Sequence, residues 1–212
     1  FSSSLHDLME AVDKADCTNF SENDVLNPEG WVFLNYLMDP RTGLGRYKNF
    51  NISNYNLMLK LVDLCSKKSI TEIMEDPDVR ERIVLYNEEQ EKFKEQIKRC
   101  TKVDGNIAIL DVRNEELIHV GNRFMVYALF PECNVSVHIF YGKQNQNTVF
   151  AVGKSIVNRS CPIDIGAMMY EYAGGGHMNA GTCQVDNDKA DETLKSIIEN
   201  IKKLESESEV QE

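Results

Sequence analysis

The amino-acid pattern changes at residue 104, and this change constrains the fold more than any other feature of the 212-residue chain. Before it, apolar residues recur at intervals of three and four, the spacing of amphipathic helices. After it, β-branched runs such as NIAILDV (106–112), VSVHIFYG (135–142) and TVFAVG (148–153) read as strands and alternate with helical patterns. The sequence therefore predicts a mostly helical first segment and a second lobe of the α/β class with a mixed sheet.

Three helices are expected in the first segment. The run SSSLHDLMEAVDKADC (2–17) opens with a serine cap, and PEGWVFLNYLMD (28–39) reads as a largely buried helix begun by Pro28. SNYNLMLKLVDLC (53–65) has a capping serine at Ser53 and apolar residues on one face.

A longer helix is predicted from residue 76 to residue 100, because an acidic cap, Asp76, precedes a proline at the first helical position, Pro77. Its apolar residues form a narrow stripe on a highly charged surface. We interpret it as a connector between two lobes, with a short coiled-coil contact as the alternative. The apolar positions in the stripe are Val79, Ile83, Tyr86, Phe93, Ile97 and Cys100.

The second lobe contains further helical patterns. They cover GNRFMVYALFP (121–131), PIDIGAMMYEY (162–172) and a final helix from about Ala190, and a short strand, GTCQV (181–185), precedes that helix. Residues 206–212 are acidic and read as a disordered tail.

A glycine run lies between the helix at 162–172 and the strand at 181–185. The stretch YEYAGGGHMNAGTC (170–183) holds three consecutive glycines, Gly174, Gly175 and Gly176, followed by His177. A helix end needs one or two glycines, and additional ones suit close approach of the backbone to an anionic group. A tight packing turn between buried elements is the alternative.

Charge and cysteine content limit the classes of function. A net charge of −11 argues against a protein that coats nucleic acid, which needs a basic face, and favours a small anionic substrate. The six cysteines form no CxxC pair, so we expect reduced thiols and a cytoplasmic protein rather than a zinc site. No apolar run is long enough to span a bilayer, and no membrane partner is expected.

The second lobe resembles the C-terminal domain associated with DHH phosphoesterases. In that family an Arg-Ser pair is followed by a helix, a GGGH-type run and then small residues. In this chain the pair is Arg159–Ser160, the run is 174–177, and the small residues are Asn179, Ala180 and Gly181. GWVFLNYLMDPRTGLGRYKNF (30–50) is similar to the exopolyphosphatase-related subgroup, which is akin to oligoribonucleases. Many members have a fourth glycine where this chain has Ala173; we assign that position to the helix exit and expect little loss of binding.

The resemblance implies a domain plan and a metal site. Residues 1–75 would be the C-terminal part of the DHH catalytic domain, 76–103 the connector helix and 104–205 the substrate-binding domain. Asp16 fits the family's last metal-ligand aspartate best and Asp13 second, for a two-metal site holding Mn²⁺ or Mg²⁺; a solvent-facing carboxylate is the alternative for each. The DHH triplet and the first aspartate motifs are not in these residues. They are expected upstream of Phe1, so this stretch alone is expected to be inactive.

The resemblance also assigns roles in a phosphate site. Arg159 would bind a phosphate, the glycine run would donate backbone N–H groups, and His177 would act in catalysis as well as in binding. Apart from the resemblance, Arg123 at the start of a predicted helix is a candidate to reach a terminal phosphate. Arg41 and Arg46 flank a loop that would touch substrate, with ordinary turn chemistry as the alternative. Each of these roles has an alternative: Arg159 would form a surface ion pair, His177 would cap the helix exit, and Arg123 would be an ordinary surface arginine. The substrate-binding set is Arg123, Arg159, Ser160, Gly174, Gly175, Gly176, His177 and Asn179.

The function implied is metal-dependent hydrolysis of phosphoester bonds in short oligonucleotides or small nucleotides. The partner expected is therefore a short oligonucleotide or a small phosphorylated substrate, and a homodimer is compatible with these features. Two alternatives come from other classes: a non-catalytic module that binds nucleotides or RNA, and a structural dimerisation lobe.

Overall fold

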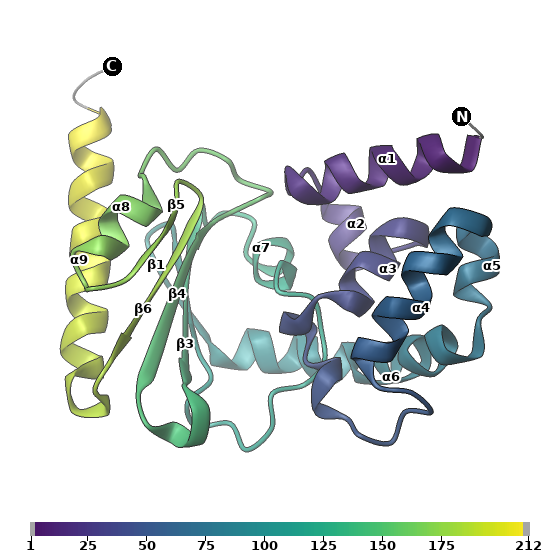
Figure 1. The fold of residues 1–212 in the computed structure, drawn as a ribbon. Coiled ribbons are helices and arrows are strands. Elements are labelled where there is room, and N and C mark those ends of the chain that lie inside the picture. The colour runs from purple at the N-terminus through teal and green to yellow at the C-terminus, as the bar shows by residue number, and fades with distance from the viewer. Residues whose placement is uncertain (1–2, 210–212) are drawn as a thin grey trace. The chain divides into compact units, whose positions relative to one another are not determined.

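The computed structural model describes residues 3–209, and these residues form two compact units (Figure 1). The helical unit runs to Gln96 and also includes Leu117–Ala128. The sheet unit comprises Ile97–Glu116 and the chain from Leu129 onward.

Helices account for nearly all regular structure in the helical unit. Several local signals act as predicted: Ser53 caps a helix by accepting a hydrogen bond from the Asn56 N–H, and the longest helix begins at Pro77. One helix begins at Gly30 rather than at Pro28, because Glu29 is extended and takes the N-cap position. The helices are α1 (Ser3–Asp16), α2 (Glu22–Leu26), α3 (Gly30–Met38), the 3₁₀ turns η1 (Pro40–Thr42) and η2 (Leu44–Arg46), α4 (Asn54–Lys67), α5 (Ile70–Met74), α6 (Pro77–Cys100) and α7 (Met125–Leu129).

The core of the helical unit forms where α3, α4, α5 and α6 meet. The α6 stripe supplies Val79 and Tyr86, which pack with Leu37, Leu57 and Ile73, all at most 1% exposed. Burial of such a stripe explains how a helix with so many charges stays folded, since the polar residues remain on its outer face.

The sheet unit contains one mixed sheet, as predicted. Its strand order is β1-β2-β3-β4-β6-β5, in which β2 and β3 are parallel and every other neighbouring pair is antiparallel. Two strands were not predicted: β1 directly follows α6, and β5 lies in the glycine run. The strands are β1 (Thr101–Asp104), β2 (Ile107–Asp111), β3 (Val135–Tyr141), β4 (Thr148–Lys154), β5 (Gly175–His177) and β6 (Ala180–Val185).

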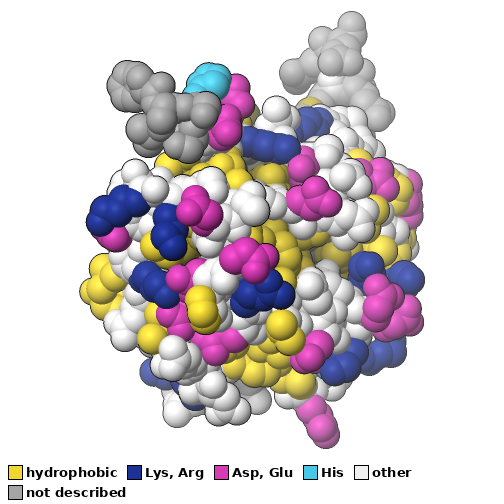
Figure 2. All heavy atoms as spheres, turned by 90° about the vertical axis from the view of Figure 1, so that its right-hand side faces the viewer, with side chains coloured by type: hydrophobic (Ala, Val, Ile, Leu, Met, Phe, Trp, Pro, Cys, Tyr) yellow, Lys and Arg dark blue, Asp and Glu magenta, His cyan; other side chains and the backbone are white. Residues whose placement is uncertain are grey.

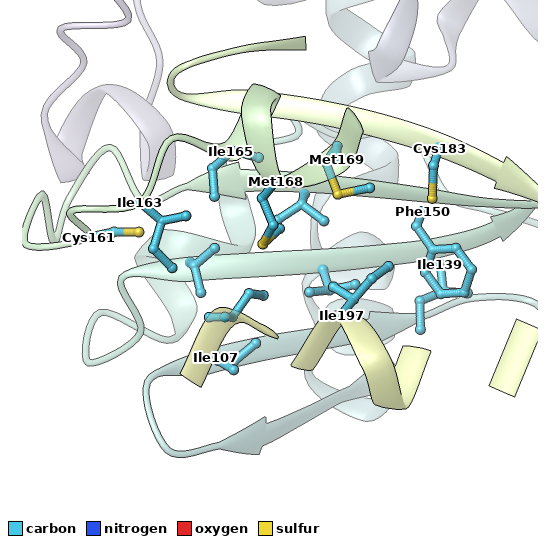
Figure 3. Packing of buried hydrophobic residues seen from close by; sticks show 14 of the residues in the cluster. Ile107, Ile139, Phe150, Cys161, Ile163, Ile165, Met168, Met169, Cys183 and Ile197 are labelled. Atoms are coloured by element: carbon cyan, nitrogen blue, oxygen red, sulfur yellow. The ribbon is translucent and has the colours of Figure 1, made fainter. Parts of the chain in front are cut away.

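One face of this sheet is covered by α8 (Ile165–Tyr170) and α9 (Ala190–Glu209) (Figure 1). Alternate residues of β3 and β4, such as Ile139 and Phe150, point to that face, as the period of two in a strand requires (Figure 3). Met168 and Met169 of α8 and Ile197 of α9 complete the buried layer. Because α9 continues to Glu209, residues 206–209 are helical where a disordered tail was expected; residues 210–212 of that tail lie outside the described residues.

The segment 117–128, expected in the second lobe, belongs to the helical unit. Long-range hydrogen bonds explain this: the Gly121 N–H donates to the Thr42 carbonyl (3.2 Å), and the Asn122 side-chain amide donates to the Val25 carbonyl (2.9 Å). The Phe124 ring also packs 5.6 Å from the ring of Phe20.

No helix within residues 3–209 is long and apolar enough to cross a membrane. All six cysteines are free, as expected from their irregular spacing.

Candidate functional site

The glycine run forms an edge strand, not the loop that the sequence suggested. Gly175, Gly176 and His177 make up β5, which pairs antiparallel with β6 across a turn formed by Met178 and Asn179. Because β5 is the last strand of the sheet, alternate backbone N–H and C=O groups point away from β6. This is the geometry in which a strand offers its backbone to a ligand.

Most glycines in this region are required by packing. A Cβ on Gly174 would clash with the Thr182 carbonyl, and a Cβ on Gly176 would clash with the Ala180 carbonyl. Packing therefore requires glycine at both positions, where it lets the hairpin fit closely against its neighbours.

Gly175 is different from the glycines on either side of it. A Cβ on Gly175 would meet nothing within 4 Å. The φ of Gly175 is also outside the left-handed region that favours glycine. Among the described glycines, only Gly30, Gly43 and Gly105 lie in that region. Neither packing among the described residues nor backbone conformation requires a glycine at position 175.

Ala173 leaves helix α8 in the left-handed conformation, with a φ of +56°. Its N–H donates to the Tyr170 carbonyl, and the Gly174 N–H donates to the Met169 carbonyl (3.0 Å), which closes the helix end. Ala173, which the sequence places at the helix exit, therefore holds an L side chain in a strained backbone conformation.

We expect Ala173→Gly to raise the free energy of unfolding by about 1 kcal/mol, because glycine adopts this conformation without the steric cost of a Cβ. Thermal or urea unfolding of the two proteins measures the difference. A variant less stable than the wild type would show that the strain at Ala173 is already offset by contacts of its methyl group.

The loop that carries Arg159 and Ser160 connects β4 to α8 and is tied to the glycine hairpin at both ends. At its start the Lys154 N–H donates to the Asn179 carbonyl (2.9 Å), and at its end the Ile165 N–H donates to the Met178 carbonyl (3.1 Å). The two ends of the Arg-Ser loop therefore meet the turn of the glycine hairpin, at the end of the sheet where β4 stops and β6 begins.

A buried polar network holds this loop. The Ser160 hydroxyl accepts a hydrogen bond from the side-chain amide of Asn134 (3.2 Å), which is only 5% exposed. The Glu205 carboxylate on α9 accepts from Asn134 (3.0 Å) and from Asn106 (2.7 Å). This hydrogen bond orients Ser160 within the loop, a contact that its place beside Arg159 in the sequence does not reveal.

Arg159 and His177 are both exposed at this end of the sheet. The Arg159 Nε donates to the Ile156 carbonyl (3.1 Å), which orients the guanidinium while the residue stays accessible to solvent. His177 ends β5 opposite Ala180. This end of the sheet therefore offers the Arg159 cation, the His177 imidazole and the main-chain groups of Gly175. Such a combination is suited to binding a phosphate.

Arg123 lies in the helical unit and is more ordered than a surface arginine would be. Its guanidinium carbon lies 4.2 Å from the centre of the Phe124 ring, and its Nε is 3.6 Å from the Asp39 carboxylate. Burial, and then the positive charge of Arg41, lower the pKa of Arg123. Arg46 has a structural contact, because its guanidinium donates to the Ile118 carbonyl.

The candidate metal ligands Asp13 and Asp16 are exposed near the end of α1. Within residues 3–209, no group of three or more His, Cys, Asp or Glu side chains could hold a metal ion. Asp13 borders a surface hollow in which Lys14 pairs with Asp24 (2.7 Å). Burial raises the pKa of Asp24, but hydrogen bonds from Lys14 and Ser21 outweigh it and lower the pKa. The described carboxylates therefore do not form a metal site by themselves.

The chain belongs to the DHH superfamily of phosphoesterases, as its relatives among solved structures show. One of these is the pGpG-specific phosphodiesterase PggH from Vibrio cholerae. It is 51% identical, with a TM-score of 0.85, and the match covers 95% of this chain and 68% of that protein.

Two more distant structures are also similar. An exopolyphosphatase-related protein from Bacteroides fragilis is 18% identical (TM-score 0.45), with 72% of this chain and 46% of that chain covered. The DHH domain of a protein described as a member of a family of ribosomal proteins is 16% identical (TM-score 0.48), with 83% and 43% covered. No protein-family model matches the chain, and no curated protein sequence matches it significantly.

Proposed function

We propose that the protein is a phosphodiesterase that hydrolyses pGpG or a similarly short 5′-phosphorylated dinucleotide. The observation that carries this proposal is the 51% identity to a pGpG-specific phosphodiesterase over 95% of the chain. In the reaction, the oxygen of a water molecule bonds to phosphorus, the 3′-oxygen of the first nucleoside leaves and takes a proton, and pGpG yields two molecules of GMP.

The end of the sheet that carries the glycine hairpin turn and the Arg-Ser loop would bind the scissile phosphate. Arg159 would donate through its planar fork, which matches two phosphate oxygens. Gly175 would leave room for the phosphate against the backbone, and Asn179 would add a polar contact from the turn. His177 would hold or deliver a proton at the leaving oxygen, since an imidazole can both accept and donate one.

Divalent metal dependence is part of the proposal. Mn²⁺ or Mg²⁺ activates the attacking water and stabilises charge on the phosphoryl oxygens in such enzymes. Asp16, or else Asp13, would supply one ligand from α1, and the other ligands would come from outside the described residues.

The charge of the surface supports a short substrate. Basic and acidic side chains are interspersed on the face shown in Figure 2, with hydrophobic side chains exposed between them. Together with the net charge of −11, this favours a ligand held by a few local contacts over a long nucleic acid strand.

A substrate panel on the full-length protein tests the proposal. The panel comprises pGpG, other 5′-phosphorylated dinucleotides, phosphoadenosine phosphate, cyclic dinucleotides and polyphosphate, each with Mn²⁺, with Mg²⁺ and after treatment with EDTA. We expect GMP from pGpG with metal and none after EDTA. Binding of pGpG without hydrolysis in either metal would favour the non-catalytic nucleotide-binding module, and hydrolysis of polyphosphate alone would overturn the proposed substrate class.

A further inference from the structure

Two arginines of the helical unit share one carboxylate. Arg41 donates to both oxygens of Asp39, from Nε (2.7 Å) and from Nη2 (2.8 Å). On the same carboxylate, the Arg123 Nε lies 3.6 Å from Oδ2. The Asp39 side chain is only 12% exposed, so its single negative charge is almost enclosed and faces two positive ones.

Two buried polar atoms in this cluster have no hydrogen-bond partner: the Arg123 Nε and the Tyr36 hydroxyl. Tyr36 is 1% exposed. A buried donor without a partner carries a cost of about 1–3 kcal/mol, and such atoms in a folded protein call for an explanation. Burial also raises the pKa of Tyr36, so its hydroxyl keeps the proton that it can donate.

The cluster is fixed in place and still accessible. The Arg123 guanidinium lies over the Phe124 ring, which packs with Phe20 and Tyr36. The side chains of Arg41 and Arg123 are 58% and 32% exposed, so solvent reaches both guanidinium groups. An anion would therefore meet donors that are already ordered, at a low cost in side-chain entropy.

We propose that Arg41 and Arg123, held by Asp39, form a phosphate-binding site of the helical unit that takes a phosphate monoester. A monoester has three non-bridging oxygens and about two negative charges, so it can accept from both guanidinium groups and balance both, whereas a phosphodiester has two such oxygens and one charge. Its negative charge would also relieve the repulsion between the two arginines. The 5′ end of pGpG and the GMP product carry such a group, but the site does not depend on the proposed hydrolysis.

An NMR titration of the chain with inorganic phosphate tests the site directly, because each arginine Nε–H gives its own ¹⁵N–¹H signal. The signals of Arg41 and Arg123 are expected to shift and saturate together. Arg80 is the matched control: its side chain is 57% exposed and is also paired with one carboxylate, Glu75. Shifts that do not saturate, or that Arg80 shares, would overturn the proposal.

Two variants and a second ligand pair sharpen this test. In Arg41→Met the phosphate concentration that half-saturates the Arg123 signal is expected to rise by at least about tenfold, as loss of a charge-assisted bidentate contact predicts. Arg80→Met should leave it unchanged. GMP should shift the same signals and guanosine should not. Equal affinity in Arg41→Met, or equal shifts from guanosine, would contradict a phosphate site, whatever the outcome of the substrate panel.

Discussion

His177→Ala is expected to lower kcat of the full-length protein on pGpG by about 10²–10⁴-fold, the range that a positioned general acid or base contributes. The midpoint of thermal unfolding should not change, because the His177 side chain is exposed at the end of an edge strand and its backbone pairing with Ala180 is kept. Steady-state kinetics with pGpG and a thermal melt measure the two quantities.

Two further variants separate proton transfer from binding. His6→Ala removes a histidine of α1 whose side chain is 73% exposed, and it should change neither kcat nor KM. His177→Gln retains a hydrogen-bond donor but cannot shuttle a proton, so it should lower kcat nearly as much as alanine does. If both His177 variants raise KM and leave kcat unchanged, the residue binds substrate only and the acid–base assignment is wrong.

Local signals in the sequence predicted much of the fold. The start of α6 follows from Asp76 and Pro77, whose effects act within one turn of the helix. The strands β2, β3 and β4 follow from β-branched runs bounded by turn residues. Each of these patterns depends on neighbours in the chain, so the sequence alone contains the necessary information.

The elements that were missed depend on contacts between distant residues. Glycine has a low tendency to form strands, so nothing local marks β5, which exists because its backbone pairs with β6 and α8 packs closely beside it. β1 follows α6 without a break residue. The segment 117–128 joins the helical unit through bonds to Thr42 and Val25, which no periodicity could indicate.

The candidate sites show the same division. The sequence singled out Arg123 and Arg41 separately, but not Asp39, which brings them together, nor Tyr36, whose hydroxyl lacks a partner. In the sheet unit, the motif indicated Ser160, and its hydrogen bond to Asn134 joins residues 26 positions apart, which no motif could show.

Alanine at Gly176 is expected to lower stability, whereas alanine at Gly175 is expected to leave stability unchanged and to weaken binding. Gly176→Ala should lower the free energy of unfolding by about 3 kcal/mol, the upper part of the range for overpacking, because its Cβ would press on the backbone of Ala180 and Gly181, which cannot rotate away. Gly175→Ala should stay within about 0.5 kcal/mol of the wild type, since nothing lies within 4 Å of the added atom. Urea unfolding measures both values.

Binding then distinguishes the two reasons for which a glycine is present. If a phosphate approaches the backbone at Gly175, the added methyl group occupies its place, and Gly175→Ala should weaken pGpG binding by at least about tenfold, or 1.4 kcal/mol. Calorimetric titration of the folded variant with pGpG measures this loss. Gly105→Ala is the converse control: its φ of +64° favours glycine, so this variant should lose stability and keep wild-type affinity. Wild-type affinity in Gly175→Ala would mean that the run serves packing alone, through Gly174 and Gly176. A loss of affinity without a loss of stability requires that the open space beside Gly175 is filled by substrate.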